Sequence, residues 1–78
     1  MEALLVELAR RLVDEPDVVR VEQVEGDDGS LVFRLHVAEG DVGKVIGRQG
    51  RTAKAVRTLL GAAGMKLHKR YTLEILED

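Results

Sequence analysis

"GKVIGRQGRTAKAVRTLL", residues 43–60, is the stretch that decides the fold of this chain. Gly47 and Gly50 stand three positions apart, with Arg48 and Gln49 between them. Apolar residues at helical spacing lie on both sides, so the pattern predicts a helix, a short loop and a second helix. A loop that opens a helix presents unpaired backbone N–H groups and the positive end of the helix dipole. We therefore expect this loop to contact an anion.

The charge of the chain is segregated around this loop. The 78 residues have a net charge of −2, yet residues 41–70 carry eight basic side chains and only one acidic side chain. Residues 1–40 have a net charge of −6, and residues 71–78 a net charge of −3. A basic region within an acidic chain is the electrostatic pattern of a polyanion-binding protein. The alternative is a mixed charge distribution that only keeps the surface hydrated.

Length and composition predict one small domain over residues 1–78. The absence of cysteine excludes disulfides and thiolate metal sites, so stability must come from packing of the 45% hydrophobic residues. No apolar run approaches the roughly 20 residues that span a bilayer. Glu2 and Glu7 interrupt the N-terminal apolar stretch, which argues against a signal peptide. We expect a cytoplasmic protein that does not engage a membrane.

Four elements are predicted before the loop. A helix over residues 2–14 has apolar side chains at helical spacing, and Pro16 ends it. Strands over residues 18–24 and 31–37 are separated by a turn rich in glycine and aspartate. Asp41 is the predicted N-cap of a short helix over residues 42–46. The second strand alternates, and its predicted buried face carries Leu31, Phe33, Leu35 and Val37.

Two elements are predicted after the loop. The first is a helix over about residues 50–63, with Gly64 as its C-terminal cap. The second is a strand over residues 70–76. The order helix–strand–strand–helix–helix–strand indicates an α+β fold of two layers, with the helices on one face of the sheet. The predicted buried stripe of the long helix is Ala53, Val56, Leu60 and Ala63, with Leu59 beside it.

Enzymatic and cofactor motifs are absent from the sequence. Val45 stands where a Walker A loop or a dinucleotide-binding loop requires glycine. His36 and His68 have no carboxylate pair at ligand spacing, so we interpret both as surface residues. Ser30 has no adjacent base that would activate it as a nucleophile. We therefore predict no enzyme, no metal, no cofactor and no small-molecule substrate.

Residues 43–60 closely resemble the centre of a KH domain, an RNA-binding module in which a GxxG loop joins two helices. The element order is similar to the bacterial, type II arrangement of that fold. The chain length, "IGRQGR" and "AKAVRTLL" together resemble the KhpA family of small single-KH bacterial proteins. The resemblance covers nearly the whole chain and is strongest over residues 40–60. It implies a three-stranded mixed sheet with helices packed on one face.

The resemblance also implies roles for individual residues. The GxxG loop, Gly47, Arg48, Gln49 and Gly50, would grip the RNA backbone. One of Val45 and Ile46 would line the groove for the bases, and the other would enter the core. Basic residues that would flank the phosphate path are Lys44, Arg51 and Lys54. Secondary contacts would come from the next helical turn and from the opposite groove wall: Arg57, Lys66, Lys69 and Arg70.

The function implied by the resemblance is sequence-tolerant binding of single-stranded RNA, as an RNA chaperone or post-transcriptional regulator tied to cell elongation and division. The implied partners are a second copy of the chain, a larger protein of the KhpB (Jag/EloR) type, or both. The extra apolar positions Leu4 and Val6 on the first helix serve either core packing or such a dimer contact. The alternative function is a protein-interaction module that uses a KH scaffold without RNA.

Overall fold

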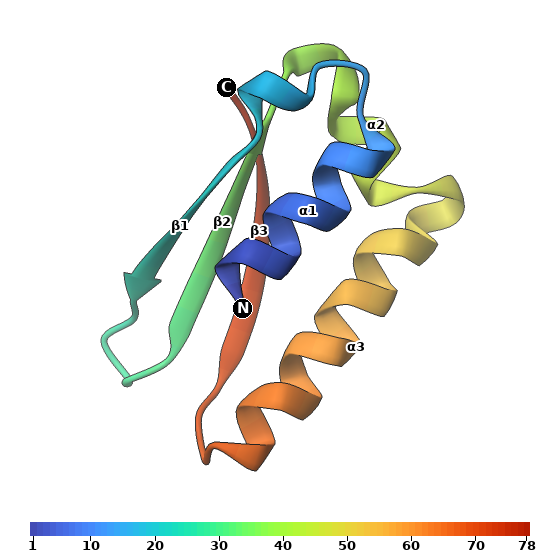
Figure 1. Cartoon of the computed structure of the whole chain (residues 1–78). Coiled ribbons are helices and arrows are strands. Elements are labelled where there is room, and N and C mark those ends of the chain that lie inside the picture. The colour runs from blue at the N-terminus through green and yellow to red at the C-terminus, as the bar shows by residue number, and fades with distance from the viewer.

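The computed structural model describes all residues, 1–78, and shows three α-helices against one three-stranded sheet (Figure 1). The element order and the α+β class confirm the prediction. Short 3₁₀ turns lie at Pro16–Val18, Glu39–Asp41 and Arg48–Gly50. The helices and strands are α1 (Glu2–Leu12), β1 (Arg20–Glu25), β2 (Leu31–Val37), α2 (Val42–Ile46), α3 (Arg51–Lys66) and β3 (Tyr71–Glu77).

The sheet has the order β1-β2-β3 and is mixed. Strand β1 pairs antiparallel with β2, so that Val21 stands opposite Leu35. Strand β3 pairs parallel with β2, so that Leu73 stands opposite Phe33. A parallel pair needs a crossover connection, and here α2, the glycine loop and α3 together form it. The crossover therefore holds the loop at a fixed place relative to the sheet.

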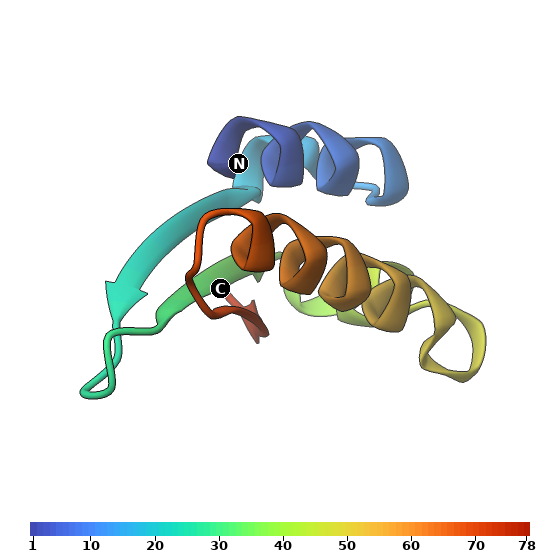
Figure 2. The same cartoon turned by 90° about the horizontal axis from the view of Figure 1, so that it is seen from below.

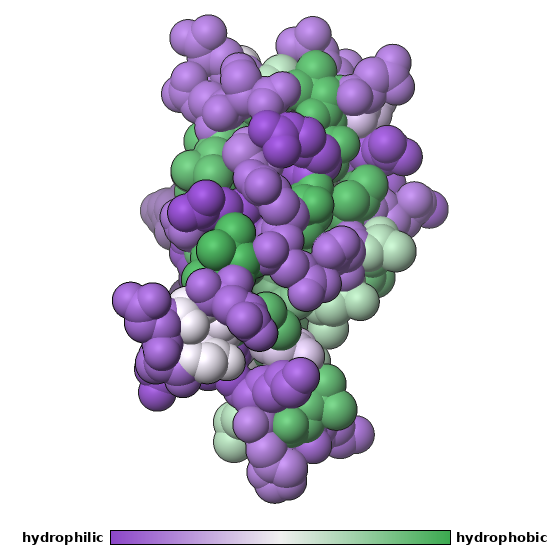
Figure 3. Space-filling model, turned by 90° about the vertical axis from the view of Figure 1, so that its left-hand side faces the viewer, coloured by the Kyte–Doolittle hydropathy of each residue, from purple (hydrophilic) through white to green (hydrophobic).

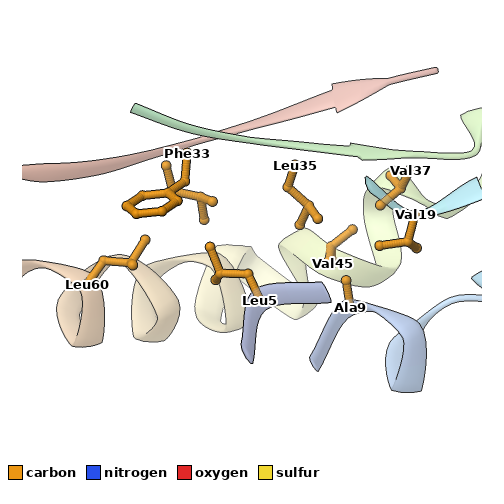
Figure 4. Packing of buried hydrophobic residues seen from close by; sticks show 9 residues of the cluster. Leu5, Ala9, Val19, Phe33, Leu35, Val37, Val45 and Leu60 are labelled. Carbon is orange, nitrogen blue, oxygen red and sulfur yellow. The ribbon is translucent and has the colours of Figure 1, made fainter. Parts of the chain in front are cut away.

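The core lies between the sheet and the helices, which all cover the same face (Figure 2). Leu5 and Leu60 come from the helices and point toward Phe33 of the sheet (Figure 4). Phe33 and Leu60 are each only 1% exposed. The Phe33 ring also meets Tyr71 edge to face, with 5.3 Å between the ring centroids. The predicted buried face of β2 is confirmed for Phe33, Leu35 and Val37, which belong to this cluster, whereas Leu31 is only partly buried and packs against it.

The first helix and the first strand differ from their predicted bounds. Helix α1 ends at Leu12 rather than residue 14, because Val13 has an extended backbone (φ −100°, ψ 162°). Strand β1 begins at Arg20 rather than residue 18, because Pro16–Val18 form a 3₁₀ turn. Proline presets the backbone angle that such a turn requires, so valine content alone predicted the strand too early.

Helix α3 extends to Lys66, beyond the predicted end at residue 63. Gly64 is not a cap but a buried residue inside the helix, and a Cβ there would lie 2.6 Å from the Lys69 carbonyl oxygen. The chain reverses at His68, which has the positive φ of 57°. Gly64 is therefore a close-packing glycine that lets the following turn fold back onto the helix. Leu59, placed beside the buried stripe by the sequence, is 68% exposed.

The other face of the sheet is not covered by a helix and is mostly hydrophilic (Figure 3). His36 was predicted to be a surface residue, but it is only 8% exposed, and its Nε2 lies 2.6 Å from Glu22 Oε1. Arg34 and Glu74 form a cross-strand ion pair nearby, at 3.4 Å. Charged pairs thus keep this face hydrated. None of the helices has the length and apolar character that crossing a membrane requires.

Candidate nucleic-acid interface

The loop between α2 and α3 has a backbone that glycine makes possible. Gly47 has φ 81° and ψ 169°, and Gly50 lies in the left-handed region with φ 74°. A Cβ on Gly47 would overlap Thr52 Oγ1. Gln49 also adopts a positive φ of 57°. The loop therefore turns sharply and projects away from the sheet, at the right of Figure 1.

Backbone hydrogen bonds tie both glycines of the loop into the fold. The Gly47 amide closes α2 by donating to the Gly43 carbonyl, and the Gly50 amide donates to the Gly47 carbonyl, each at 3.0 Å. The loop also immediately precedes the 16-residue helix α3, whose dipole favours an anion at this end.

Four exposed basic side chains surround the loop. None of them takes part in an ion pair, although Arg51 Nη2 donates to Gln49 Oε1 at 3.0 Å. The first turn of α3 contains no acidic residue, although helix dipoles favour acidic side chains there. Unpaired cations at the positive end of a helix weaken it, so a bound anion would relieve this repulsion. The four residues are Arg48, Arg51, Lys54 and Arg57.

The structure separates the roles of Val45 and Ile46. Val45 is 5% exposed and belongs to the hydrophobic core. Ile46 is 37% exposed and stands directly before Gly47. Ile46 is therefore the aliphatic side chain that is free to contact a base, whereas Val45 anchors α2 under the loop.

The side chain of Lys44 reaches the end of α1 while remaining 41% exposed. Its Nζ lies 2.8 Å from Asp14 Oδ2 and 3.4 Å from Asp41 Oδ1. The hydrogen bond to Asp14 is the main reason that the pKa of Lys44 is raised. Lys44 was predicted to flank the phosphate path, and the structure brings its ammonium within ion-pair distance of two carboxylates.

Asp41 accepts two backbone hydrogen bonds that hold α1 and α2 together. Its oxygens accept from the Asp14 amide at 3.2 Å and from the Glu15 amide at 3.0 Å, and the residue is only 2% exposed. Burial by itself would raise the pKa of Asp41, but these amide bonds and Lys44 outweigh it and lower the pKa. Asp41 does precede α2 as predicted, but its side chain makes no capping hydrogen bond. Its partners lie 26 and 27 positions away, and no local sequence signal predicts them.

The predicted secondary RNA contacts at the C-terminal end of α3 and in the turn after it do not lie beside the loop. They are at the opposite end of α3 from it, as Figures 1 and 2 both show. A 16-residue helix spans about 24 Å. Arg70 also pairs with Asp28 of the hairpin turn, at 3.5 Å. The separated residues are Lys66, Lys69 and Arg70.

An apolar groove lies between α1 and α3. Leu4 and Leu59 line it and are 63% and 68% exposed. The sequence indicated this surface only through Leu4, an extra apolar position for which a dimer contact was one of two expected roles. Val6, the other extra apolar position, instead packs against the core. The full lining is Met1, Leu4, Leu5, Leu8, Val56, Leu59 and Leu60.

Curated proteins similar to this chain share one name. "RNA-binding protein KhpA" from Aquifex aeolicus is 53% identical over 74 residues, covering 94% of this chain and 92% of that protein. The protein of the same name from Clostridium acetobutylicum is 50% identical over 76 residues, covering 97% of this chain and all of that protein. The Chlamydia trachomatis protein is 40% identical over 78 residues, covering 100% and 99%.

A solved structure with a similar fold is the crystal structure of Era in complex with MgGDPNP and nucleotides 1506–1542 of 16S ribosomal RNA. The match has a TM-score of 0.56 and 23% sequence identity, and it covers 97% of this chain and 29% of that chain. At this identity the likeness concerns the fold alone.

The family comparison agrees with the fold, the loop and the relatives. The matching model is described as "KhpA/KhpB, KH domain" and covers residues 2–75. It is not an enzyme family, which confirms the prediction that the chain is not an enzyme. The chain belongs to the KhpA/KhpB family of KH domains.

Proposed function

We propose that this chain is a single KH domain, residues 1–78, that binds single-stranded RNA through the GxxG loop. The observation that carries the proposal is the loop itself: positive φ angles at Gly47, Gln49 and Gly50 beside four basic side chains without ion pairs. Its relatives are named as RNA-binding proteins, which supports the same ligand.

The mode of binding follows from the chemistry of the loop. Backbone N–H groups of Arg48 and Gln49 hold phosphate oxygens, and glycine allows the sugar-phosphate backbone to approach closely. Arg51 and Lys54 extend the positive field along α3. Ile46 offers an aliphatic surface to a base. No aromatic side chain borders the loop, so base stacking contributes little and the preference for sequence is weak.

In the cell, we propose that the protein acts in the cytoplasm as an RNA chaperone or post-transcriptional regulator, in processes tied to cell elongation and division. One small groove gives limited affinity, and pairing two domains raises it through avidity. The exposed α1–α3 groove supports self-association, because Leu4 and Leu59 leave apolar surface in water. We include a homodimer, and a heterodimer with a KhpB-type protein, in the proposal.

The test is fluorescence-anisotropy binding to a pool of short single-stranded RNAs. The wild type is compared with the double variant Arg48→Asp plus Gln49→Asp, and circular dichroism verifies that both are folded. We expect the double variant to lose binding, because two carboxylates would replace the phosphate contacts. A matched control, Arg10→Asp plus Gln23→Asp, makes the same exchanges at exposed positions of α1 and β1 and should bind.

The second candidate function, a protein-interaction module that does not bind RNA, is favoured only by the α1–α3 groove. It predicts that the wild type and the loop variant behave alike toward RNA. Salt dependence also separates the two functions. RNA affinity falls by about 0.7 log units per log unit of salt for each phosphate neutralised on a single strand, whereas an apolar contact does not weaken with salt.

A further inference from the structure

We propose that Lys44 and Asp41 form a clasp that positions the GxxG loop, and that Lys44 is not a phosphate contact. The inference rests on the proposed RNA-binding function and assigns Lys44 a role different from the one that the KH resemblance implies. It starts from the short helix α2, which has five residues and ends at the loop.

Helix α2 is too short to hold its own orientation. Isolated helices below about 12 residues are marginal in water, so tertiary contacts must fix α2. Val42 and Val45 supply the contacts to the core. The clasp supplies a polar contact on another side: Asp41, directly before α2, binds the amides that follow α1, and Lys44 Nζ lies 2.8 Å from Asp14 Oδ2.

The direction of Lys44 argues against a place on the phosphate path. Successive helical residues are about 100° apart, so Lys44 and Ile46 project from α2 at about 200° to each other. Ile46 is half-exposed and adjoins the loop, and Lys44 projects to the opposite side, where Asp14 and Asp41 lie. Two carboxylates within 3.4 Å of the Lys44 ammonium also offset its field at a more distant phosphate.

The clasp therefore acts on RNA through the loop. With the clasp intact, α2 keeps one orientation, so that the loop starts at Gly47 from a fixed position. Without it, α2 is held by the apolar contacts of Val42 and Val45, and the loop is in the binding-competent shape for only part of the time. The apparent Kd rises by the inverse of that fraction, so a fall to about one tenth weakens binding about tenfold.

The experiment measures RNA affinity as a function of salt for Lys44→Met, Lys44→Arg and Lys54→Gln, at a temperature where all variants are folded. We expect Lys44→Met to weaken binding about threefold to tenfold with an unchanged salt slope. Lys54→Gln, a phosphate-path control, should reduce the slope by about 0.7. Lys44→Arg should restore most of the affinity, because it keeps the charge and the reach to Asp14.

The sign of the effect of Asp14→Asn is decisive. If Lys44 positions the loop, removing its carboxylate partner weakens RNA binding. If Lys44 contacts phosphate, Asp14→Asn frees the ammonium and tightens binding. The control is Asp17→Asn, because Asp17 is an exposed residue in the turn after α1. It measures the general effect on RNA affinity of removing one negative charge. Tighter binding by Asp14→Asn than by Asp17→Asn, or a reduced slope for Lys44→Met, would overturn the clasp.

A measurement without RNA keeps the clasp distinct from the proposed function. Hydrogen exchange of residues 42–50 should be faster in Lys44→Met than in the wild type, while β2 and β3 exchange as before. If the wild type fails to bind RNA but this local change is seen, the RNA function is wrong and the clasp remains. If exchange is unchanged in residues 42–50, the clasp is wrong whatever the RNA result.

Discussion

At the scale of single residues, the loop depends on backbone shapes that few residues adopt. Gly47 (φ 81°, ψ 169°) lies in a region that is essentially reserved for glycine. Gly50 is left-handed, but open space surrounds the place of its missing Cβ. The two glycines of the motif are thus not equivalent: Gly47 is required by both backbone and packing, and Gly50 by backbone alone.

Gly47→Ala should lower the free energy of unfolding by about 2 kcal/mol or more, because the new Cβ meets Thr52 and the backbone angle is strained. Urea unfolding measures this change. The control is Gly43→Ala in α2, where nothing lies within 4 Å of the new Cβ. It should raise stability by about 0.5–1 kcal/mol, since alanine favours a helix over glycine. Equal effects of the two variants would contradict the assigned geometry.

At the scale of elements, prediction from the sequence succeeded where one local pattern dominates. Strand β2 and helix α2 have the predicted bounds, because alternation in one and flanking glycines around the other are strong signals. The predicted end of α3 was wrong. A glycine that caps a helix and a glycine that packs closely inside one look the same in a sequence. The hydrogen bonds from the Asp14 and Glu15 amides to Asp41 were not predicted, because only the fold brings these residues together.

The two glycines within α3 allow a matched test of this distinction. Gly64→Ala should lower the free energy of unfolding by about 1–3 kcal/mol, because its Cβ would lie 2.6 Å from the Lys69 carbonyl oxygen. Gly61→Ala places a Cβ in open space and should raise stability by about 0.5–1 kcal/mol. Thermal or urea unfolding measures both. A Gly64→Ala protein as stable as Gly61→Ala would show that the turn after α3 does not press on the helix.

At the scale of the whole molecule, the charges are arranged in separate regions. The loop end of α3 carries four unpaired basic residues, and the opposite end lies near the acidic hairpin turn, where Asp28 pairs with Arg70. The uncovered face of the sheet carries neutralising pairs. A long anion therefore meets four unpaired cations at the loop and only two, Lys66 and Lys69, at the opposite end of α3, which agrees with the proposed direction of RNA approach.

Acid should destabilise the molecule through carboxylates that the fold keeps ionised. Burial would raise the pKa of Asp41, but hydrogen bonds lower it below the ordinary value of 3.8. Its contribution is complete above that value and is lost as the pH falls through the lower pKa of the folded state. Urea unfolding between neutral pH and about pH 2 should show a shallower acid decline for Asp41→Asn than for wild type. An Asp17→Asn control should keep the wild-type decline.

Self-association through the α1–α3 groove predicts a selective effect of Leu59→Glu. Leu59 is 68% exposed, so the change should alter monomer stability by no more than about 0.5 kcal/mol. A carboxylate in the apolar groove should nevertheless prevent dimer formation, which sedimentation equilibrium measures directly. Thr58→Glu, on the same helix but outside the groove lining, is the control. A Leu59→Glu protein that sediments as the wild type does would remove this groove from the proposal.

The positions of the two chain ends have a practical consequence for attaching probes. Met1 lines the groove between α1 and α3, so a fluorophore or affinity tag at the N-terminus would sit across the proposed dimer surface. Asp78 lies beside β1, with its carboxylate 3.1 Å from Arg20 and its amide bonded to the Val37 carbonyl. A C-terminal label leaves both the groove and the loop uncovered. Comparing proteins labelled at either end thus reports on dimerisation without altering the helices themselves.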